Sequence, residues 1–179
     1  MCEHEQKGVT LWFTGLPCSG KSAVADRVAE RLKDRGYRVE RLDGDIVRQS
    51  LTRDLGFSKA DREENIRRVA FVAKLLTRNE VFVLTSFVSP YREMREAARK
   101  EIGSFLEVYT KCPIEECIRR DVKGMYQKAK KGEIKEFTGV SDPYEEPVHP
   151  DILLETDKEP PEQSAARVLT RMRELGYLE

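Results

Sequence analysis

The 179-residue sequence has no apolar run near the roughly 18 residues that a membrane-spanning helix needs. It has no charge of one sign in excess either, because 32 Lys and Arg balance 32 Asp and Glu, and this argues against a nucleic-acid coat or a polybasic membrane anchor. Four cysteines (Cys2, Cys18, Cys112 and Cys117) are too few and too scattered for a disulfide framework. The polar first seven residues are unlike a signal peptide. These absences predict a cytoplasmic protein that binds neither nucleic acid nor membranes.

Short apolar runs alternate with helical patterns, which predicts an α/β fold: one domain, residues 1–179, with a parallel sheet flanked by helices. Strands are expected at residues 9–14, 37–42, 81–86, 105–110 and 152–154. Helices are expected at residues 22–35, 59–78, 113–129 and 162–175. Ser89 and Pro90 are expected to form the N-cap and the first position of a further helix. Residues 130–150 are irregular, as is typical of a lid or a binding loop.

A glycine-rich motif lies between the first expected strand and the first expected helix. Its sequence, Gly-Leu-Pro-Cys-Ser-Gly-Lys-Ser at residues 15–22, matches G-x-x-x-x-G-K-[ST], the phosphate-binding P-loop. The motif predicts a P-loop NTPase fold that binds a nucleotide through Gly15, Leu16, Pro17, Cys18, Ser19, Gly20, Lys21 and Ser22. Lys21 would reach the β- and γ-phosphates, and the Ser22 hydroxyl would bind Mg²⁺. Cys18 is expected to be a spacer, because no histidine base accompanies it.

The P-loop by itself leaves a motor, a GTPase, an ATPase and a small-molecule kinase open. The chain contains no Asn-Lys-x-Asp tetrad of the kind that reads guanine, and this argues against a GTPase. A minimal domain with an irregular lid favours a small-molecule kinase.

Two carboxylates, Asp43 and Asp45, follow the second expected strand, on the sheet edge where the P-loop also lies. A carboxylate there can hold Mg²⁺ or accept the proton of an attacking hydroxyl. We predict that Asp43 helps Ser22 to hold the metal and borders the substrate, and that Asp45 is catalytic. The alternative is that Asp45 only caps a short helix.

A basic and polar set follows the two carboxylates. On a helix, Arg62, Asn65 and Arg68 would share one face, which is either a solvated face paired with Glu63 and Glu64 or an anion-binding surface.

From Gly15 onward, nearly the whole chain resembles the adenylyl-sulfate kinases (APS kinases). Besides the P-loop, the resemblance rests on Leu-Asp-Gly-Asp at 42–45, Arg-Asp-Leu-Gly-Phe-Ser at 53–58, Asp-Arg-Glu-Glu-Asn-Ile-Arg-Arg at 61–68 and Ser-Pro-Tyr-Arg at 89–92. It continues through Arg-Asp-Val-Lys-Gly-Met-Tyr-x-Lys-Ala at 120–129 and Gly-Glu-Ile-Lys-x-Phe-Thr-Gly-Val-Ser-Asp-Pro-Tyr-Glu-x-Pro at 132–147. The loop departs from the family at residues 17–19, Pro-Cys-Ser, where many members have Ser-Gly-Ala.

The resemblance implies phosphorylation of adenosine 5′-phosphosulfate (APS) by ATP with Mg²⁺, in a homodimer that associates in some members with ATP sulfurylase. It implies an acceptor site built from Arg48, Phe57, Arg62, Asn65, Lys123 and Phe137. Arg120 and Lys128 would neutralise charge on the ATP phosphates. It also assigns Ser89 as a phosphoserine intermediate, although direct transfer needs only a positioned hydroxyl, Mg²⁺ and a base, and we favour direct transfer.

Two other functions stay open on the sequence: a non-catalytic, nucleotide-binding regulatory domain, and a P-loop kinase of another small hydroxyl acceptor. Cys112 and Cys117 are expected to be core thiols, because no second ligand pair for a metal accompanies them.

Overall fold

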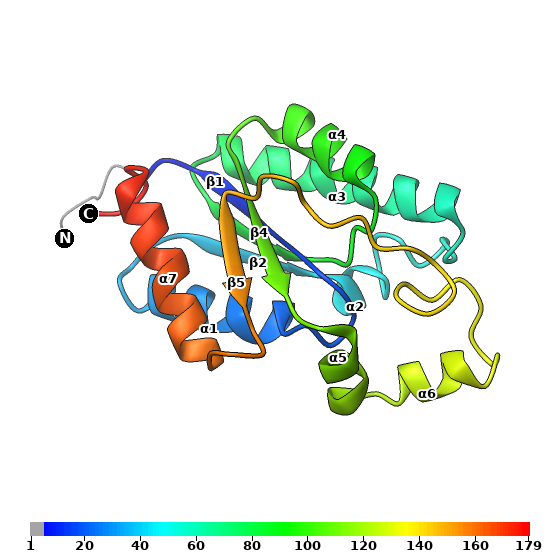
Figure 1. Ribbon diagram of the computed structural model, residues 1–179. Helices are drawn as coiled ribbons and strands as arrows, with labels where there is room; N and C mark the ends of the chain where they lie inside the picture. The colour runs from blue at the N-terminus through cyan, green and yellow to red at the C-terminus, as the bar shows by residue number, and fades with distance from the viewer. Residues whose placement is uncertain (1–5) are drawn as a thin grey trace.

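The computed structural model describes residues 6–179 and contains a five-stranded sheet in which every paired strand is parallel (Figure 1). The strands are β1 (Val9–Thr14), β2 (Val39–Asp43), β3 (Phe82–Ser86), β4 (Phe105–Lys111) and β5 (Ile152–Glu155), in the order β2-β3-β1-β4-β5. The prediction of five parallel strands is confirmed. Residues 1–5, with Cys2 and most of the polar start, lie outside the described residues.

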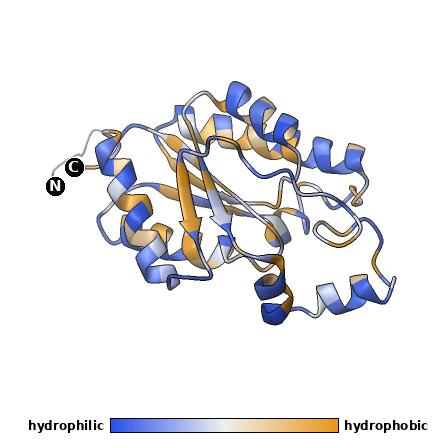
Figure 2. Ribbon diagram, in the orientation of Figure 1, coloured by the Kyte–Doolittle hydropathy of each residue, from blue (hydrophilic) through white to orange (hydrophobic). Residues whose placement is uncertain are grey.

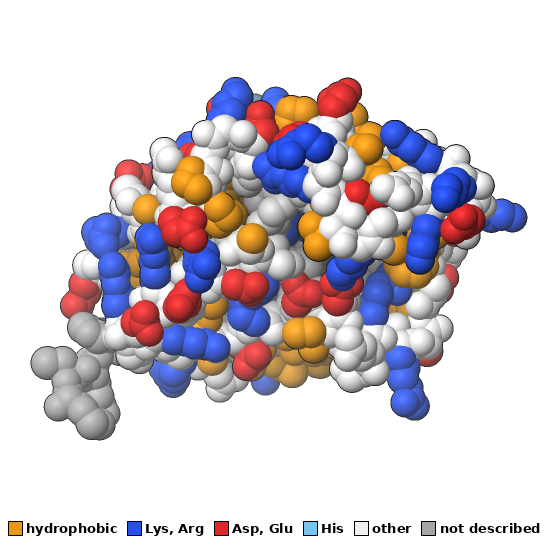
Figure 3. Space-filling model, turned by 90° about the horizontal axis from the view of Figure 1, so that it is seen from below, with side chains coloured by type: hydrophobic (Ala, Val, Ile, Leu, Met, Phe, Trp, Pro, Cys, Tyr) orange, Lys and Arg blue, Asp and Glu red, His pale blue; other side chains and the backbone are white. Residues whose placement is uncertain are grey.

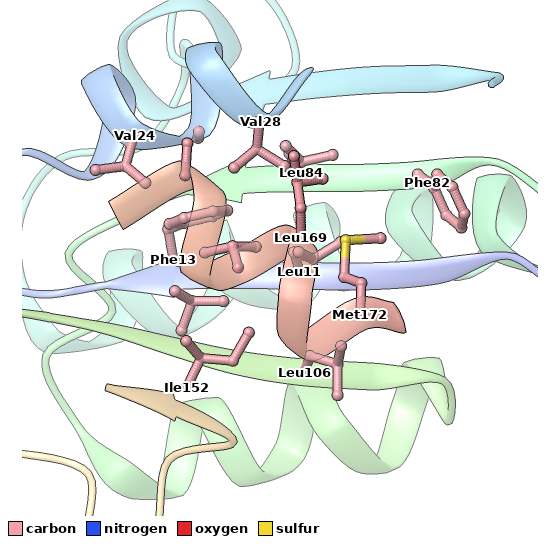
Figure 4. Close-up of a cluster of buried hydrophobic side chains, with 14 of the residues drawn as sticks. Leu11, Phe13, Val24, Val28, Phe82, Leu84, Leu106, Ile152, Leu169 and Met172 are labelled. Atoms are coloured by element: carbon pink, nitrogen blue, oxygen red, sulfur yellow. The ribbon is translucent and has the colours of Figure 1, made fainter. Parts of the chain in front are cut away.

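Helices cover both faces of the sheet. One face carries α1 (Lys21–Lys33) and α7 (Pro161–Glu174), and the other carries α3 (Lys59–Arg78) and α4 (Arg92–Ile102). Side chains alternate along β1, so that Leu11 and Phe13 pack under α1 and α7 (Figure 4). Trp12, which points to the other face, packs under α3 and α4. The hydropathy of the helices follows the same division, with apolar inner faces and polar outer faces (Figure 2). None of the described helices is long and apolar enough to span a membrane.

Residues 113–129 are mostly helical, as expected, but the segment is divided into α5 (Ile114–Arg120) and α6 (Met125–Lys130). Gly124, between them, has φ +65°, which a continuing helix does not allow. The Asp121 carboxylate then accepts hydrogen bonds from the backbone N–H groups of Tyr126 (3.0 Å) and Gln127 (3.1 Å) and so starts α6. The break turns α6 beneath the lid, which we define as residues 130–150.

The expected helix start at Ser89 is wrong. Helix α4 begins at Arg92, with Tyr91 as its N-cap residue. Ser89 has φ +41° and is buried, and its hydroxyl is bonded to other elements, so it cannot cap the helix. Tertiary contacts have replaced the local capping that the Ser-Pro pair predicts.

The remaining expectations agree with the structure. Residues 162–175 form α7 to within one residue at each end, and residues 130–150 are irregular apart from one isolated bridge between Thr138 and Asp142. Cys112 and Cys117 are buried thiols in a small core with Tyr126, and burial raises the pKa of Cys117 to about 12.

Candidate functional site

A cavity of ≈ 1100 Å³ lies at the carboxyl edge of the sheet. Figure 3 views the molecule from below, toward the side on which Figure 1 shows α5 and α6, and acidic and basic side chains stand together on that surface. The predicted site residues that line the cavity are Pro17, Cys18, Gly20, Lys21, Ser22, Asp43, Asp45, Arg48, Phe57, Arg62, Asn65, Ser89, Arg120, Lys123 and Phe137. Most of the predicted site is therefore brought together by the fold.

Four predicted residues do not line this cavity in the described part of the chain. Lys128 is exposed on α6, and Leu16 borders a separate cavity of ≈ 330 Å³. Ser19 lies behind the loop, where its hydroxyl is 2.8 Å from the Thr110 hydroxyl. Gly15 packs so tightly there that a Cβ would come within 2.6 Å of Thr110 and Ser19, so only glycine fits.

The ammonium group of Lys21 is buried at the base of the cavity. It donates hydrogen bonds to the carbonyl oxygens of Gly15 (3.0 Å) and Leu16 (2.7 Å). Burial lowers the pKa of Lys21 to about 8, because these neutral carbonyls do not balance the charge. A phosphate on the loop would supply the anion that this ammonium lacks.

Ser22 and Asp43 form an oxygen pair at the start of α1 and the end of β2. The Ser22 hydroxyl donates to Asp43 Oδ2 at 2.6 Å. Asp43 Oδ1 accepts the backbone N–H of Asp45 at 3.0 Å and so caps the four-residue helix α2 (Gly44–Val47). The alternative that Asp45 caps this helix is wrong, since Asp43 does so. Hydroxyl and carboxylate oxygens are ligands that Mg²⁺ prefers, so the pair fits that metal.

Asp45 is exposed at the mouth of the cavity, where it forms an ion pair with Lys123 from the turn before α6. The hydrogen bond that Lys123 donates to the Asp45 carboxylate raises the pKa of Lys123. Two predicted site residues that are far apart in the sequence thus meet across the opening.

Phe57 and two arginines form the opposite wall. The guanidinium of Arg48 lies 4.3 Å from the centre of the Phe57 ring and donates to the carbonyl oxygens of Leu55 (3.2 Å) and Gly56 (3.0 Å). Burial, together with the nearby charge of Arg62, lowers the pKa of Arg48. The 53% exposed Phe57 ring leaves a free aromatic surface at the cavity.

Arg62 joins the start of α3 to the lid. It donates to the carbonyl oxygen of Phe57 at 2.7 Å, to the Thr138 hydroxyl at 3.1 Å and to the carbonyl oxygen of Glu136, and it lies 3.6 Å from Asp142. Arg62, which the sequence predicts to bind an anion, therefore also holds the lid.

Asn65 is buried, and its Oδ1 has no hydrogen-bond partner within residues 6–179. A buried acceptor without a partner is unfavourable, which makes it a natural site for a donor group of a ligand. Phe137, from the lid, lies near it in the cavity wall and packs edge-on against Tyr126 at 5.0 Å between ring centres.

Comparison with known proteins decides the family. The family model described as "Adenylylsulphate kinase" matches residues 7–155. The chain belongs to the adenylyl-sulfate kinase family. An adenylyl-sulfate kinase of Halothermothrix orenii is 61% identical over 175 residues, which cover 98% of this chain and 95% of that protein.

Solved structures of the family are similar as well. The APS kinase of Mycobacterium tuberculosis in complex with AMPPNP and APS matches with a TM-score of 0.91 and 44% identity, over 94% of this chain and 99% of that one. A hexameric APS kinase from Thiobacillus denitrificans matches with a TM-score of 0.75 and 32% identity, over 98% of this chain and 30% of that one.

One of the loop residues that departs from the APS kinase pattern, Cys18, has an unusual backbone conformation. Cys18, where many members of the family have glycine, has φ +62°, a left-handed conformation that favours glycine. The loop keeps its shape because Thr156 donates from its hydroxyl to the Ser19 carbonyl oxygen at 2.7 Å.

Sequence reasoning missed the turn after β5, where residues 156–160 line the cavity. The Arg120 guanidinium donates to the Thr156 carbonyl oxygen at 2.7 Å and to Glu116 at 2.8 Å, so α5 and this turn are joined beside the P-loop. The position of the turn could have identified it, because residues that directly follow a parallel strand lie on the binding edge of the sheet.

Proposed function

We propose that this protein transfers the γ-phosphoryl group of ATP to the ribose 3′-hydroxyl of APS and so forms ADP and 3′-phosphoadenosine 5′-phosphosulfate, as expected for sulfate assimilation. The observation that carries the proposal is that one cavity joins a P-loop to a wall of two arginines and two phenylalanines. Its volume of ≈ 1100 Å³ exceeds the ~300–1,000 Å³ of an ordinary ligand pocket, and this suits two nucleotides.

In this proposal the P-loop end binds ATP. Lys21 contacts the β- and γ-phosphates, and the loop N–H groups and the start of α1 face them. Ser22 and Asp43 would hold Mg²⁺, which would supply positive charge opposite these phosphates. Arg120 borders the same end, whereas a contribution from Lys128 would require α6 to move toward the cavity.

The other end of the cavity binds APS. Phe57 and Phe137 offer ring surfaces for adenine, and Arg48 and Arg62 offer guanidinium forks for the phosphosulfate. Asn65 Oδ1 would accept a hydrogen bond from a ribose hydroxyl or an amine of the acceptor. Lys123 would add positive charge at the opening.

We further propose that transfer is direct. The 3′-oxygen of APS bonds to the γ-phosphorus while the bond from that phosphorus to the leaving oxygen of ADP breaks, and the hydroxyl proton passes to Asp45. Ser89 lacks a base for the covalent route: its hydroxyl accepts from Trp12 Nε1 at 3.0 Å and donates to the Thr14 hydroxyl at 3.1 Å. Among the described residues, the hydrogen-bond partners of this hydroxyl are all neutral groups.

Ser89→Ala is expected to keep turnover within about tenfold of wild type. It should lower the free energy of unfolding by about 1–3 kcal/mol, because the buried Trp12 N–H loses its acceptor. Urea denaturation, turnover rates and the intact mass after brief incubation with ATP alone test this. A kinetically competent phosphoserine, together with an inactive Ser89→Ala protein, would refute direct transfer.

A coupled assay of ADP release, with APS as the varied acceptor, tests the function itself. Release that saturates with APS supports the proposal. Binding of both nucleotides without release would indicate the regulatory-domain alternative, and release with a different hydroxyl acceptor, but not with APS, would indicate another kinase.

Arg62→Ala is expected to weaken APS binding by about 2–3 kcal/mol while ATP binding changes little, because a charge-assisted fork is lost only at the acceptor end. Arg67→Ala is the matched control, since Arg67 lies on the same helix and pairs with Glu64 on the exposed face. Calorimetry with each ligand measures both. Weaker ATP binding with unchanged APS binding would reverse the assignment of the two ends.

We also propose that the chain is a single-domain, cytoplasmic homodimer that can associate with ATP sulfurylase. Support comes from the one continuous sheet in residues 6–179 and from membership of the family. Light scattering of the purified protein tests the dimer, and copurification with the sulfurylase tests the association.

A further inference from the structure

Arg95, on the inner side of α4, is 2% exposed and joins three separate segments. Its Nε donates to Glu107 of β4, its Nη1 to the Ser89 carbonyl oxygen and its Nη2 to the Glu145 carbonyl oxygen, each at 2.7 Å. One planar side chain thereby connects the sheet, the loop after β3 and the end of the lid.

Stability alone does not account for this buried charge. Burial raises the pKa of Glu107, while Arg95 acts against that rise. A buried ion pair is often no more stabilising than apolar residues of the same size. A guanidinium, however, can hold two carbonyl groups in fixed directions, which an apolar side chain cannot do.

The segment that Arg95 holds, residues 144–146, is called the strap here. Three further hydrogen bonds of 2.8 Å tie it to the start of α4: Glu145 N–H to the Pro90 carbonyl oxygen, Arg92 N–H to the Glu145 carboxylate, and Arg92 Nε to the Glu146 carbonyl oxygen. Figure 1 shows this yellow-orange part of the chain passing close to the start of α4. The Tyr144 hydroxyl also lies 2.9 Å from that of Thr14, next to the P-loop.

Both segments held by Arg95 lead into the cavity. Residues 86–90 line it directly, and Ser89 among them keeps a left-handed backbone that is unusual for serine. The strap continues the lid segment that carries Phe137 and Thr138, whose other end Arg62 holds. Arg95 therefore anchors the lid at the strap, and Arg62 holds the part of the lid around Thr138.

We infer that Arg95 is a positioning residue for the acceptor: it sets the place of the 86–90 loop and of the lid against APS. This inference rests on the proposed function for its substrate. The P-loop has supports of its own, because Ser19 is held by Thr110 and Thr156, and neither of these residues contacts Arg95 in the described hydrogen bonds.

Arg95→Lys tests the inference, because lysine keeps the charge beside Glu107 but cannot bond both carbonyl groups. The matched control is Arg99→Lys, one turn further along α4: Arg99 lies 4.0 Å from Glu107 and 2.7 Å from Asp151. Within residues 6–179 its hydrogen bonds go to Phe105 and Asp151, and not to the strap or the 86–90 loop. Arg95→Lys is expected to raise the KM for APS about tenfold, with the Kd for ATP within about twofold of wild type. Arg99→Lys should keep both constants.

A second readout is independent of turnover. Trypsin should cleave the lid faster in Arg95→Lys than in Arg99→Lys, after Lys130, Lys131 or Lys135, because the lid loses its anchor. If Arg95→Lys matches Arg99→Lys in KM and in cleavage, the inference is overturned. The inference is also overturned if Arg95→Lys binds ATP and APS more weakly to the same degree and has a lower Tm, because that result would show that Arg95 only stabilises the fold. If the wild-type protein is inactive with APS while the two variants still differ in lid cleavage, the proposed function is refuted. The role of Arg95 as an anchor of the lid then still stands.

Discussion

Lys21→Ala is expected to lower turnover by about 10³-fold. In the proposed function Lys21 supplies the positive charge that contacts the β- and γ-phosphates, and alanine removes this charge. Alanine also frees the carbonyl oxygens of Gly15 and Leu16, which phosphates would repel. Initial rates at saturating ATP and APS measure the loss.

The control for this experiment is Lys33→Ala, because Lys33 is an exposed lysine at the far end of the same helix. Its turnover should equal that of wild type. Circular dichroism on both variants separates lost chemistry from lost fold. If a folded Lys21→Ala protein retained near wild-type rates, the assignment of the P-loop as the phosphate site would have to be abandoned.

Asp45→Asn is expected to lower turnover by about 10²–10⁴-fold, while ATP and APS still bind. The amide keeps the shape of the carboxylate but cannot take the proton of the attacking hydroxyl. The Asp45 carboxylate is paired with Lys123 at the cavity mouth, so some loss of local order around Lys123 accompanies the substitution. Single-turnover rates and calorimetry of both ligands distinguish the chemical effect from a binding effect.

Asp54→Asn provides the matched control. Asp54 is an exposed aspartate that is also paired with a basic side chain, Arg68, and it does not line the cavity. It should keep full turnover. If Asp45→Asn were as active as Asp54→Asn, Asp45 would be excluded as the base, and Asp43 would become the candidate base.

Local patterns in the sequence predicted the strands and the tight P-loop turn well, because those features depend on neighbours in the chain. The β1 residues are mostly apolar and all buried, and β1 lies at the centre of the sheet. The P-loop spacing needs a close approach at Gly15, and the structure has it. Since all parallel strands end at one edge, the gathering of Asp43 and Asp45 near Lys21 also followed from the order of the elements.

Long-range contacts decided what the sequence could not. Ser89 looks like a helix cap, yet Trp12, 77 residues away, binds its hydroxyl in the interior, and a tertiary bond there outweighs the local preference. Asp43 rather than Asp45 caps α2, since the N-cap is chosen by backbone geometry.

The sequence by itself determined the parallel α/β fold, the P-loop and the residue types of both halves of the cavity, because periodicity and short motifs encode them. Only the tertiary structure decided that Arg62 holds the lid, that Asn65 Oδ1 is buried without a partner among residues 6–179, and that Arg95 joins Ser89 to Glu145. The physical reason is that burial and hydrogen bonding between segments far apart in the chain depend on how the helices and loops pack, and no local pattern of residues specifies that packing.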